Sequence, residues 1–384
     1  MNIVYFIPHL REASGINRVL NIKANYLADV LKYKVTIITY RQYDSIIFFP
    51  FNKNVKLVHF DLDDPTFRVK SLPFIEKRRQ IKKFMSNYKN LVEHYLLENK
   101  TDICISLFLG AEYKFLHEIK DKSKKILEFH MNFDNSPFKL LNKTFRLSNF
   151  RSIIQINQLR NKLEKYDQFV VLTDGDAQNW KKYFSKVIVI ANPLTIKQDH
   201  PAPLLSNKKA IAVRRLEKEK GFDYLIDAWK TVNKQHPDWL LNIYGEGSLE
   251  NNLSTQIKHS NLENCIYIKK AVSNIAEKYL ESSVFILSSR NEGFGLVLME
   301  AIALGIPSVS FNCKFGPEEL INDGDNGLLV EAGNVEALAA KIITIIENEN
   351  LRKIISRSAA LSTQKYNVSK IMEKWNLLFK SLAN

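Results

Sequence analysis

The sequence of 384 residues lacks the features that mark several classes of protein. Its three cysteines (Cys104, Cys265 and Cys313) are too far apart to form a disulfide framework or a zinc site. No apolar run approaches the ~18 residues of a membrane-spanning helix. The first eight residues have neither the basic lead nor the apolar length of a secretory signal, and they fit a buried strand better. We therefore expect a folded protein in the reducing cytoplasm.

Glycine is also scarce, and it is unevenly placed. The chain has 13 glycines, or about 3% of its residues, where ~7% is usual. Seven of the 13 lie within 41 residues, namely Gly293, Gly295, Gly305, Gly316, Gly324, Gly327 and Gly333. Such clustering indicates tight turns or close backbone approach in that segment. Plain turns account for Gly324 and Gly327, but they account less readily for Gly293 and Gly295.

Basic residues are concentrated in the first half of the chain. Residues 1–193 hold 32 Lys and Arg against 19 Asp and Glu, a net charge of +13, whereas residues 194–384 hold 23 against 22, a net charge of +1. This asymmetry suggests that the first half faces an anion, such as nucleic acid, membrane headgroups or a phosphorylated substrate. A surface that only keeps the protein in solution is the alternative explanation.

Short β-branched runs alternate with helical patterns along the whole chain. The predicted strands include Ile3–Ile7, Lys34–Thr39, Ile103–Leu107, Lys125–Phe129, Gln168–Leu172, Lys186–Ile190, Lys209–Val213, Leu240–Tyr244, Cys265–Ile268, Val284–Leu287 and Ser308–Phe311. The predicted helices include Asn17–Leu31, Phe74–Leu97, Phe222–Gln235, Ile275–Glu281 and Leu296–Leu304. Nearly all-apolar strands alternating with helices predict an α/β protein with two doubly wound parallel sheets facing each other across a cleft. Residues 192–209, with three prolines and no clear period, are predicted to link a domain of residues 1–193 to one of residues 194–367.

Residues 288–307 carry the strongest chemical signal. A predicted strand ends at Leu287, a glycine-bearing turn follows, and a helix is predicted to begin near Leu296, where free amides and the helix dipole favour a diphosphate. Glu292 lies in the turn, and Glu300 lies inside an apolar helix, where its carboxylate needs hydrogen-bond donors such as ribose hydroxyls. In the alternative interpretation, Glu300 is a salt-bridged helix residue and Glu292 a solvated loop charge.

Residues 212–222 also pass from a strand through a turn into a helix. Arg215 and Lys220 are five residues apart in the connecting loop, so both side chains can reach one phosphate group. The basic residues of this loop are equally compatible with an ordinary solvated surface, because Glu217 and Glu219 offset them.

Taken together, these segments resemble the C-terminal domain of family 4 retaining glycosyltransferases, which have the GT-B fold. The similarity covers residues 211–330 and includes Arg215…Lys220-Gly221, Tyr244-Gly245-Glu246-Gly247, Glu292-Gly293-Phe294-Gly295 through Glu300-Ala301, and Gly316-Pro317-Glu318-Glu319. The resemblance implies that Arg215 and Lys220 bind the donor diphosphate, that Glu300 binds the ribose and that Glu292 contacts the transferred sugar. It also implies that Gly245 and the backbone of Gly293, Phe294, Gly295, Leu296 and Val297 line the donor site.

The N-terminal half resembles the family more loosely. Gly15 stands where the family often has the second glycine of a pair before a helix, and Ser14 replaces the first. His130 ends a predicted strand, where the family commonly places a histidine near the donor sugar, although a lone histidine at a strand end is often only structural. Two departures stand out in the other half. Arg214 replaces the usual glycine before the motif arginine, and Lys269-Lys270-Ala271 replaces a frequent glycine.

The resemblance implies a metal-independent, retaining transferase that moves a hexose or N-acetylhexosamine from a nucleotide sugar to a hydroxyl. We expect UDP as the nucleotide, no cofactor, and a polyprenyl-diphosphate-linked sugar as acceptor, because Asn312-Cys313-Lys314-Phe315-Gly316-Pro317 resembles enzymes of bacterial surface polysaccharide synthesis. The alternatives are another GT-B chemistry, either a nucleotide-sugar epimerase or a sugar phosphorylase, and a nucleic-acid-binding protein. No nucleic-acid module is recognisable, so we expect no nucleic acid as partner.

Two further segments carry expectations. Residues 368–382 show a helical apolar period, and the resemblance implies that this helix returns to the N-terminal domain. Residues 68–89 form a basic amphipathic segment predicted to dock the protein at the cytoplasmic face of the plasma membrane. Its basic residues are Arg68, Lys70, Lys77, Arg78, Arg79, Lys82 and Lys83, against the single acid Glu76. Its apolar residues are Phe74, Ile75, Ile81, Phe84 and Met85, which alternatively pack on their own domain.

Overall fold

The computed structural model describes residues 1–65, 73–136, 138–139, 150–197, 199–272 and 274–383. The chain forms two compact units. Unit 1 comprises Met1–Pro193 together with Val368–Asn384, and unit 2 comprises Leu194–Asn367. Arg68 and Lys70 of the predicted docking segment lie outside the described residues. Residues 192–208 contain no helix or strand in their described part.

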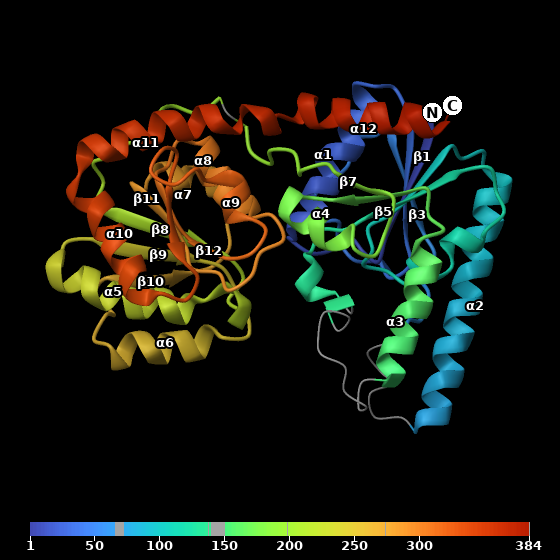
Figure 1. The fold of residues 1–384 in the computed structure, drawn as a ribbon, viewed down its shortest axis with the longest axis horizontal. Coiled ribbons are helices and arrows are strands. Elements are labelled where there is room, and N and C mark those ends of the chain that lie inside the picture. Colours follow the sequence, from blue (N-terminus) through green and yellow to red (C-terminus); the bar gives the residue numbers. More distant parts are fainter. Residues whose placement is uncertain (66–72, 137, 140–149, 198, 273, 384) are drawn as a thin grey trace. The chain divides into compact units, whose positions relative to one another are not determined.

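Unit 1 is built on a parallel sheet of seven strands in the order β3-β2-β1-β4-β5-β6-β7 (Figure 1). The strands are β1 (Asn2–Ile7), β2 (Lys34–Thr39), β3 (Val55–His59), β4 (Ile103–Ser106), β5 (Lys124–Glu128), β6 (Gln168–Val171) and β7 (Val187–Val189). The helices are α1 (Gly15–Asp29), α2 (Phe74–Glu98), α3 (Phe150–Leu163), α4 (Asp174–Trp180) and α12 (Val368–Ala383).

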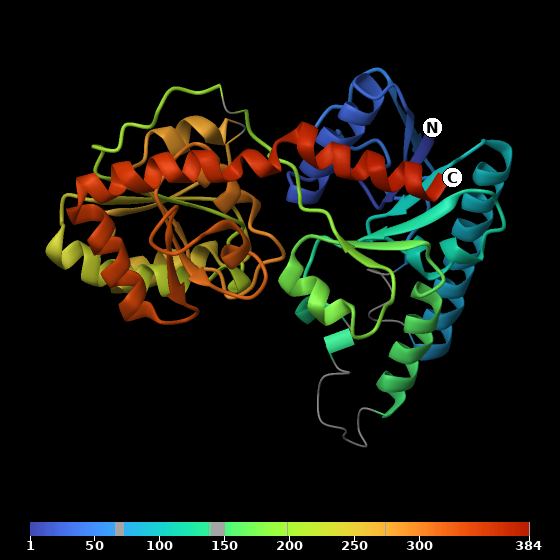
Figure 2. The same ribbon diagram turned by 45° about the horizontal axis from the view of Figure 1, so that its top comes forward.

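The two faces of this sheet have different covers. Because successive side chains of a strand point to opposite faces, Val4 and Phe6 join a core with α2, α3 and α4, whereas Tyr5 lies on the other face. That second face is covered by α1 and by α12, which lies along α1 (Figures 1 and 2). α12 buries Ile371, Met372, Trp375 and Phe379. The C-terminal helix is therefore a structural part of unit 1.

Unit 2 has a parallel sheet of six strands in the order β10-β9-β8-β11-β12-β13. The strands are β8 (Lys209–Val213), β9 (Leu240–Tyr244), β10 (Ile266–Lys269), β11 (Val284–Leu287), β12 (Ser308–Asn312) and β13 (Leu328–Glu331). The helices are α5 (Phe222–Gln235), α6 (Glu250–His259), α7 (Ile275–Leu280), α8 (Leu296–Ala303), α9 (Pro317–Leu320), α10 (Val335–Glu347) and α11 (Glu349–Ser362).

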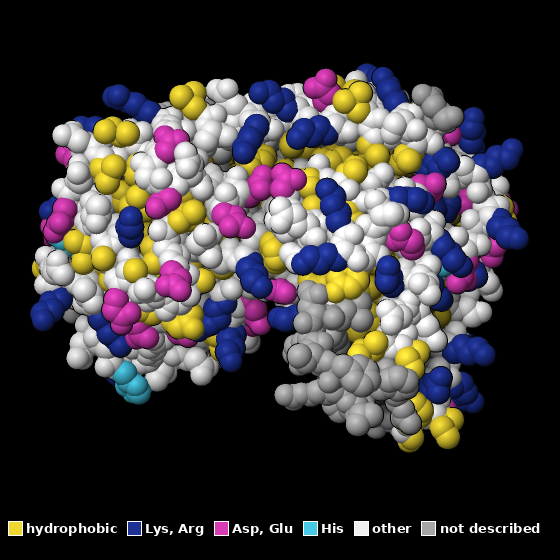
Figure 3. Space-filling model, viewed as in Figure 1, with side chains coloured by type: hydrophobic (Ala, Val, Ile, Leu, Met, Phe, Trp, Pro, Cys, Tyr) yellow, Lys and Arg dark blue, Asp and Glu magenta, His cyan; other side chains and the backbone are white. Residues whose placement is uncertain are grey.

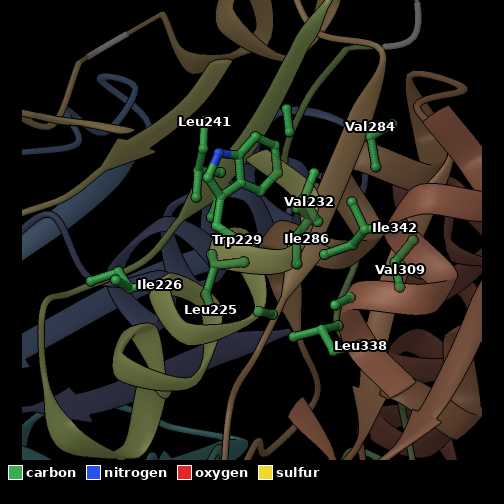
Figure 4. Close-up of a cluster of buried hydrophobic side chains, with 14 of the residues drawn as sticks. Leu225, Ile226, Trp229, Val232, Leu241, Val284, Ile286, Val309, Leu338 and Ile342 are labelled. Atoms are coloured by element: carbon green, nitrogen blue, oxygen red, sulfur yellow. The ribbon is translucent and has the colours of Figure 1, made fainter. Parts of the chain in front are cut away.

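One face of this sheet forms a large apolar core around a tryptophan. Trp229 of α5 and Ile342 of α10 are fully buried against Leu241, Ile286 and Val309 of the strands (Figure 4). Burying a side chain of this size contributes about 1.5–3 kcal/mol, so the core holds the sheet and its loops in place. The loops at the carboxyl ends of the strands are thus presented by a rigid frame.

The prediction of an α/β protein with two doubly wound, parallel sheets is confirmed, and the predicted strands are all present. β3 and β13 were not among the predicted strands. Both lie at an edge of their sheet; in β3 only Val55 is buried, whereas β13 alternates buried with less buried residues. Lys56 interrupts the apolar residues of β3, and β13 has only three consecutive apolar residues, so both runs are shorter than is typical of a central parallel strand.

Candidate functional site

The candidate site lies at the carboxyl ends of β8 and β11 in unit 2. The strand order reverses between these two neighbouring strands, and ligands of doubly wound sheets bind at such a switch point. Arg214 directly follows β8, and Glu292 lies in the loop between β11 and α8. The sheet therefore brings together two loops that are distant in sequence.

Glu292 is the centre of a buried ion cluster. Its side chain is 4% exposed, Arg214 Nη2 lies 2.6 Å from Oε2, and Lys220 Nζ lies 3.1 Å from Oε1. Burial alone would raise the pKa of this carboxyl, but Arg214 and then Lys220 outweigh burial and hold the pKa below its usual value. Glu292 is therefore an ionised, buried carboxylate and not a solvated loop charge.

The loop after β8 gathers cations. The pKa of Lys220 is lowered, first by burial and then by the neighbouring charge of Arg214. Arg215 is exposed, and its charge also acts on Lys220. An anion entering this loop would relieve repulsion among three cations, which suits a diphosphate.

The loop before α8 turns sharply at a glycine. Gly295 has φ +91°, a conformation that side chains rarely adopt, and Leu296 is the first residue of the helix. The first amides of α8, including those of Leu296 and Val297, have no partner within the helix and carry its positive dipole end. Gly293 is half-buried. Phe294 is buried with its ring 5.6 Å from that of Tyr366, so its side chain anchors the loop to the core.

Glu300 and Gly245 have structural neighbours of their own. Glu300 is 3% exposed, and its two oxygens accept hydrogen bonds from Thr195 and, at 3.3 Å, from the hydroxyl of Tyr279. It is thus a hydrogen-bonded carboxylate inside an apolar helix, as its position required. Gly245 lies against the backbone of Arg214, whose carbonyl oxygen a β-carbon at Gly245 would overlap. Gly245 therefore allows the loops after β8 and β9 to pack closely.

In unit 1, His130 belongs to a second buried ion cluster. Its Nε2 lies 3.1 Å from Glu128 Oε1, and Lys23 Nζ lies 2.6 Å from both Glu128 oxygens. The ammonium of Lys23 stands 3.7 Å from the centre of the Trp375 ring. Burial alone would raise the pKa of Glu128, but Lys23 and His130 outweigh it and lower that pKa to about 2.

Gly15 is the first residue of α1 and is exposed, and the hydroxyl of Ser14 caps the helix by accepting from the amide of Asn17. Sequence reasoning named His130 but missed its pairing with Glu128 and Lys23, and it did not assign Arg214 to Glu292. A signal was present for the cluster, because Lys23 lies on the apolar face of a helix and Glu128 ends an apolar strand. Charges at such positions indicate a buried pair.

The basic segment of residues 68–89 has two different halves in its described part. Phe84, Tyr88, Val92 and Leu96 of α2 are buried in the core, so the prediction that Phe84 faces a bilayer is wrong. The reason is that α2 packs its C-terminal half on the sheet. Phe74 and Ile75, at the start of α2, are 71% and 82% exposed. Figure 3 shows Lys and Arg side chains beside hydrophobic ones over this end of α2.

Two features are absent from the part of the chain that the structure describes. No described helix combines the length and the apolar character needed to cross a membrane. In the same residues, no three His, Cys, Asp or Glu side chains gather in an arrangement that could hold a metal ion.

Comparison with known proteins gives consistent results. Residues 196–361 match the family model described as glycosyl transferases group 1. An uncharacterized glycosyltransferase of Haemophilus influenzae is 34% identical over 57% of this chain and 64% of its own length, so the chain spans less than two thirds of that relative. Poly(ribitol-phosphate) α-N-acetylglucosaminyltransferase of Staphylococcus aureus is 27% identical over 97% of this chain and 80% of its own length. The crystal structure of S. aureus TarM with fondaparinux, α-GlcNAc-glycerol and UDP covers 98% of this chain and 99% of that chain, with a TM-score of 0.77 and 18% identity, which shows a shared fold.

Proposed function

We propose that the chain, which has the GT-B fold and whose residues 196–361 match the group 1 glycosyl transferases, transfers a hexose or N-acetylhexosamine from a nucleotide sugar to a hydroxyl of a sugar acceptor. The observation that carries the proposal is the buried, ionised Glu292 between Arg214 and Lys220, directly before α8. This arrangement puts a hydrogen-bond acceptor for sugar hydroxyls next to the cationic side chains of Arg214 and Lys220. A sugar diphosphate needs both.

The proposed donor is a UDP-sugar. Arg215 and Lys220, together with the amides of Leu296 and Val297, bind the diphosphate. Glu300 binds the ribose, because a carboxylate has about four acceptor sites and can accept ribose hydroxyls beside Thr195 and Tyr279. The choice of UDP is supported by the TarM structure, which contains UDP.

The proposed reaction proceeds with retention by front-face attack. The bond between the sugar C1 and the phosphate oxygen breaks, the acceptor oxygen bonds to C1 on the same face, and a donor phosphate oxygen takes the acceptor proton. Arg215 and Lys220 stabilise the charge that develops on the leaving diphosphate, so we propose no metal. Glu292 accepts hydrogen bonds from the hydroxyls of the transferred sugar.

The proposed acceptor is a lipid-linked sugar, carried on a polyprenyl diphosphate, in the synthesis of a bacterial surface polysaccharide. Support comes from the name of the relative in S. aureus, poly(ribitol-phosphate) α-N-acetylglucosaminyltransferase, which combines a sugar transfer with a phosphate-containing polymer. We further propose that the protein acts in the cytoplasm, peripherally at the plasma membrane, where such an acceptor lies.

The proposed membrane contact is the N-terminal end of α2. Phe74 and Ile75 are exposed there, and the following turns carry the basic residues Lys77, Arg78, Arg79, Lys82 and Lys83. Each basic residue near anionic lipid contributes about 1 kcal/mol, so binding should be reversible and sensitive to salt. Co-sedimentation with anionic and neutral vesicles at low and high salt tests this contact. Changing the five basic residues to Gln should abolish binding to anionic vesicles, and unaltered sedimentation would refute the contact.

A panel of nucleotide sugars tests the function itself. Release of nucleoside diphosphate is measured with and without bacterial lipid extract, and we expect release from one UDP-sugar that rises with the extract. Formation of a sugar phosphate from inorganic phosphate would indicate a phosphorylase. Inversion of the configuration at a sugar carbon without any acceptor would indicate an epimerase. Retention on heparin without any affinity for nucleotide sugars would favour a nucleic-acid-binding protein.

A further inference from the structure

Arg214 is a residue of the candidate site to which the proposed reaction gives no role. Its side chain is 16% exposed, and its guanidinium reaches the carboxylate of Glu292 from the end of β8. In the proteins that this sequence resembles, a glycine usually stands there.

The two cations of the cluster approach different oxygens of the same carboxylate. Arg214 contacts Oε2, while Lys220 contacts Oε1. Either cation can therefore leave without breaking the other contact. Lys220 is also the residue proposed to bind the diphosphate, so an arriving donor competes with Glu292 for its ammonium.

Loss of Lys220 to the donor would leave Glu292 in need of another cation. A buried carboxylate without a partner costs several kcal/mol and tends to take up a proton instead. A protonated Glu292 would no longer be anionic, and it would offer fewer hydrogen-bond acceptor positions to the sugar hydroxyls. Arg214 prevents this, because a guanidinium stays charged at any pH at which the protein is folded.

We propose that Arg214 is a positioning residue that keeps Glu292 ionised and oriented toward the transferred sugar when the donor diphosphate has engaged Lys220. The inference rests on the proposed function. Its basis is the pair of separate contacts on Glu292. In this proposal Arg214 acts through Glu292, which its guanidinium contacts, and is not itself assigned to the nucleotide or the diphosphate.

The groups that face Glu292 decide what pH dependence to expect. Arg214 follows β8, Lys220 precedes α5, and Cys313 follows β12; Arg215 acts on Lys220. Burial and then Glu292 raise the pKa of the Cys313 thiol to about 12, so this thiol stays neutral during the assay. The acid limb of the turnover profile should then report Glu292.

The test measures kcat and the donor KM against pH for the full chain and three variants. Arg214→Gln should lower kcat at least tenfold and move the acid limb to higher pH by about one unit, since one of two cations is lost. The donor KM should change less than threefold. Arg214→Lys keeps a charge without the planar fork, so its acid limb should stay at the wild-type pH while kcat recovers part of the loss.

Arg290→Gln is the matched control. Arg290 Nη2 lies 2.6 Å from Asp223 Oδ2, so this change removes an ion pair of the same length from the same unit. It should leave the acid limb unmoved. If Arg214→Gln is not folded at the assay temperature, Arg214→Lys alone decides, because a shifted acid limb in that variant contradicts the proposal.

Two results would overturn the inference while leaving the function intact. One is an unmoved acid limb in Arg214→Gln, and the other is a loss confined to the donor KM, which would make Arg214 a phosphate ligand. A wild-type protein that turns over no nucleotide sugar would instead overturn the proposed function.

Discussion

Two buried carboxylates, one in each unit, solve the same electrostatic problem in different ways. Glu128 in unit 1 and Glu292 in unit 2 are both almost completely buried; Glu128 lies between Lys23 and His130, and Glu292 lies between Arg214 and Lys220. The partners of Glu128 are sealed, since Lys23 is 1% and the His130 side chain 3% exposed. The partners of Glu292, Arg214 and Lys220, are each 16% exposed.

This difference in access separates a structural cluster from one that can meet a ligand. Lys23 is covered by the Trp375 ring, and burial lowers its pKa even though Glu128 opposes that shift. No ligand can reach its ammonium without moving α12. Lys220 keeps part of its surface open, so it can exchange Glu292 for a phosphate. We therefore expect the cluster around Glu128 to stabilise unit 1 and the cluster around Glu292 to bind a ligand.

The largest effect, a loss of stability, is expected from breaking the buried pair of Lys23 and Glu128. Lys23→Ala leaves Glu128 with a buried charge that only His130 opposes, which should destabilise unit 1 by about 3–5 kcal/mol. The loss of unfolding free energy is measured by denaturant titration, with hydrogen exchange as the probe of each unit. Lys220→Ala is the comparison in unit 2, and it should cost less, because Glu292 retains the guanidinium of Arg214 at 2.6 Å. Equal losses would show that access does not distinguish the clusters.

Acid should reveal the sealed carboxylate as well. The folded pKa of Glu128, about 2, lies below the ordinary value of 4.5, so its contribution is present above pH ~4.5 and is lost as pH falls toward 2. The shift corresponds to about 3 kcal/mol. The difference in unfolding free energy between wild type and Glu128→Gln should shrink by that amount between pH 5 and pH 2. A pH-independent difference would contradict this pKa.

A change at Glu292, whose cationic partners are partly exposed, should affect sugar transfer more than stability. Glu292→Gln keeps the shape of the side chain but removes its charge, so sugar transfer should fall about 100-fold, equivalent to about 2.7 kcal/mol, with a far smaller change in melting temperature. Transfer assays and thermal unfolding measure the two effects. Near-wild-type turnover would remove Glu292 from the site.

The smallest effect is expected at Glu300. Glu300→Ala should weaken donor binding about tenfold, or about 1.4 kcal/mol, because two ribose hydrogen bonds are lost. Titration of UDP by calorimetry measures the affinity. Tyr279→Phe, which removes only a hydroxyl that donates to Glu300, is the control and should change the affinity much less. Unchanged affinity in the Glu300 variant would leave Glu300 as a structural residue.

The sequence predicts those features that depend on neighbours along the chain. The start of α8 at Leu296 and the turn before it follow from glycines and an apolar run, and the strands of both sheets follow from short β-branched segments. The pairing of Arg214 with Glu292 could not be predicted, because it depends on two strands that are adjacent only in the sheet. The same applies to Lys23 and Glu128, which are 105 residues apart. Phe84 shows the converse, since an amphipathic pattern does not tell whether its apolar side meets lipid or the core.

The division of unit 1 into two stretches has a consequence for how the protein is made. All seven strands leave the ribosome before unit 2, and α12 leaves it only afterwards. At 5–20 residues per second, translating Leu194–Asn367 takes roughly ten to thirty seconds. For that time the nascent first unit exposes the apolar groove that α12 later fills, with Lys23 open to water. Unit 2, which is continuous, can fold during this interval, and α12 completes unit 1 only after unit 2 has been translated.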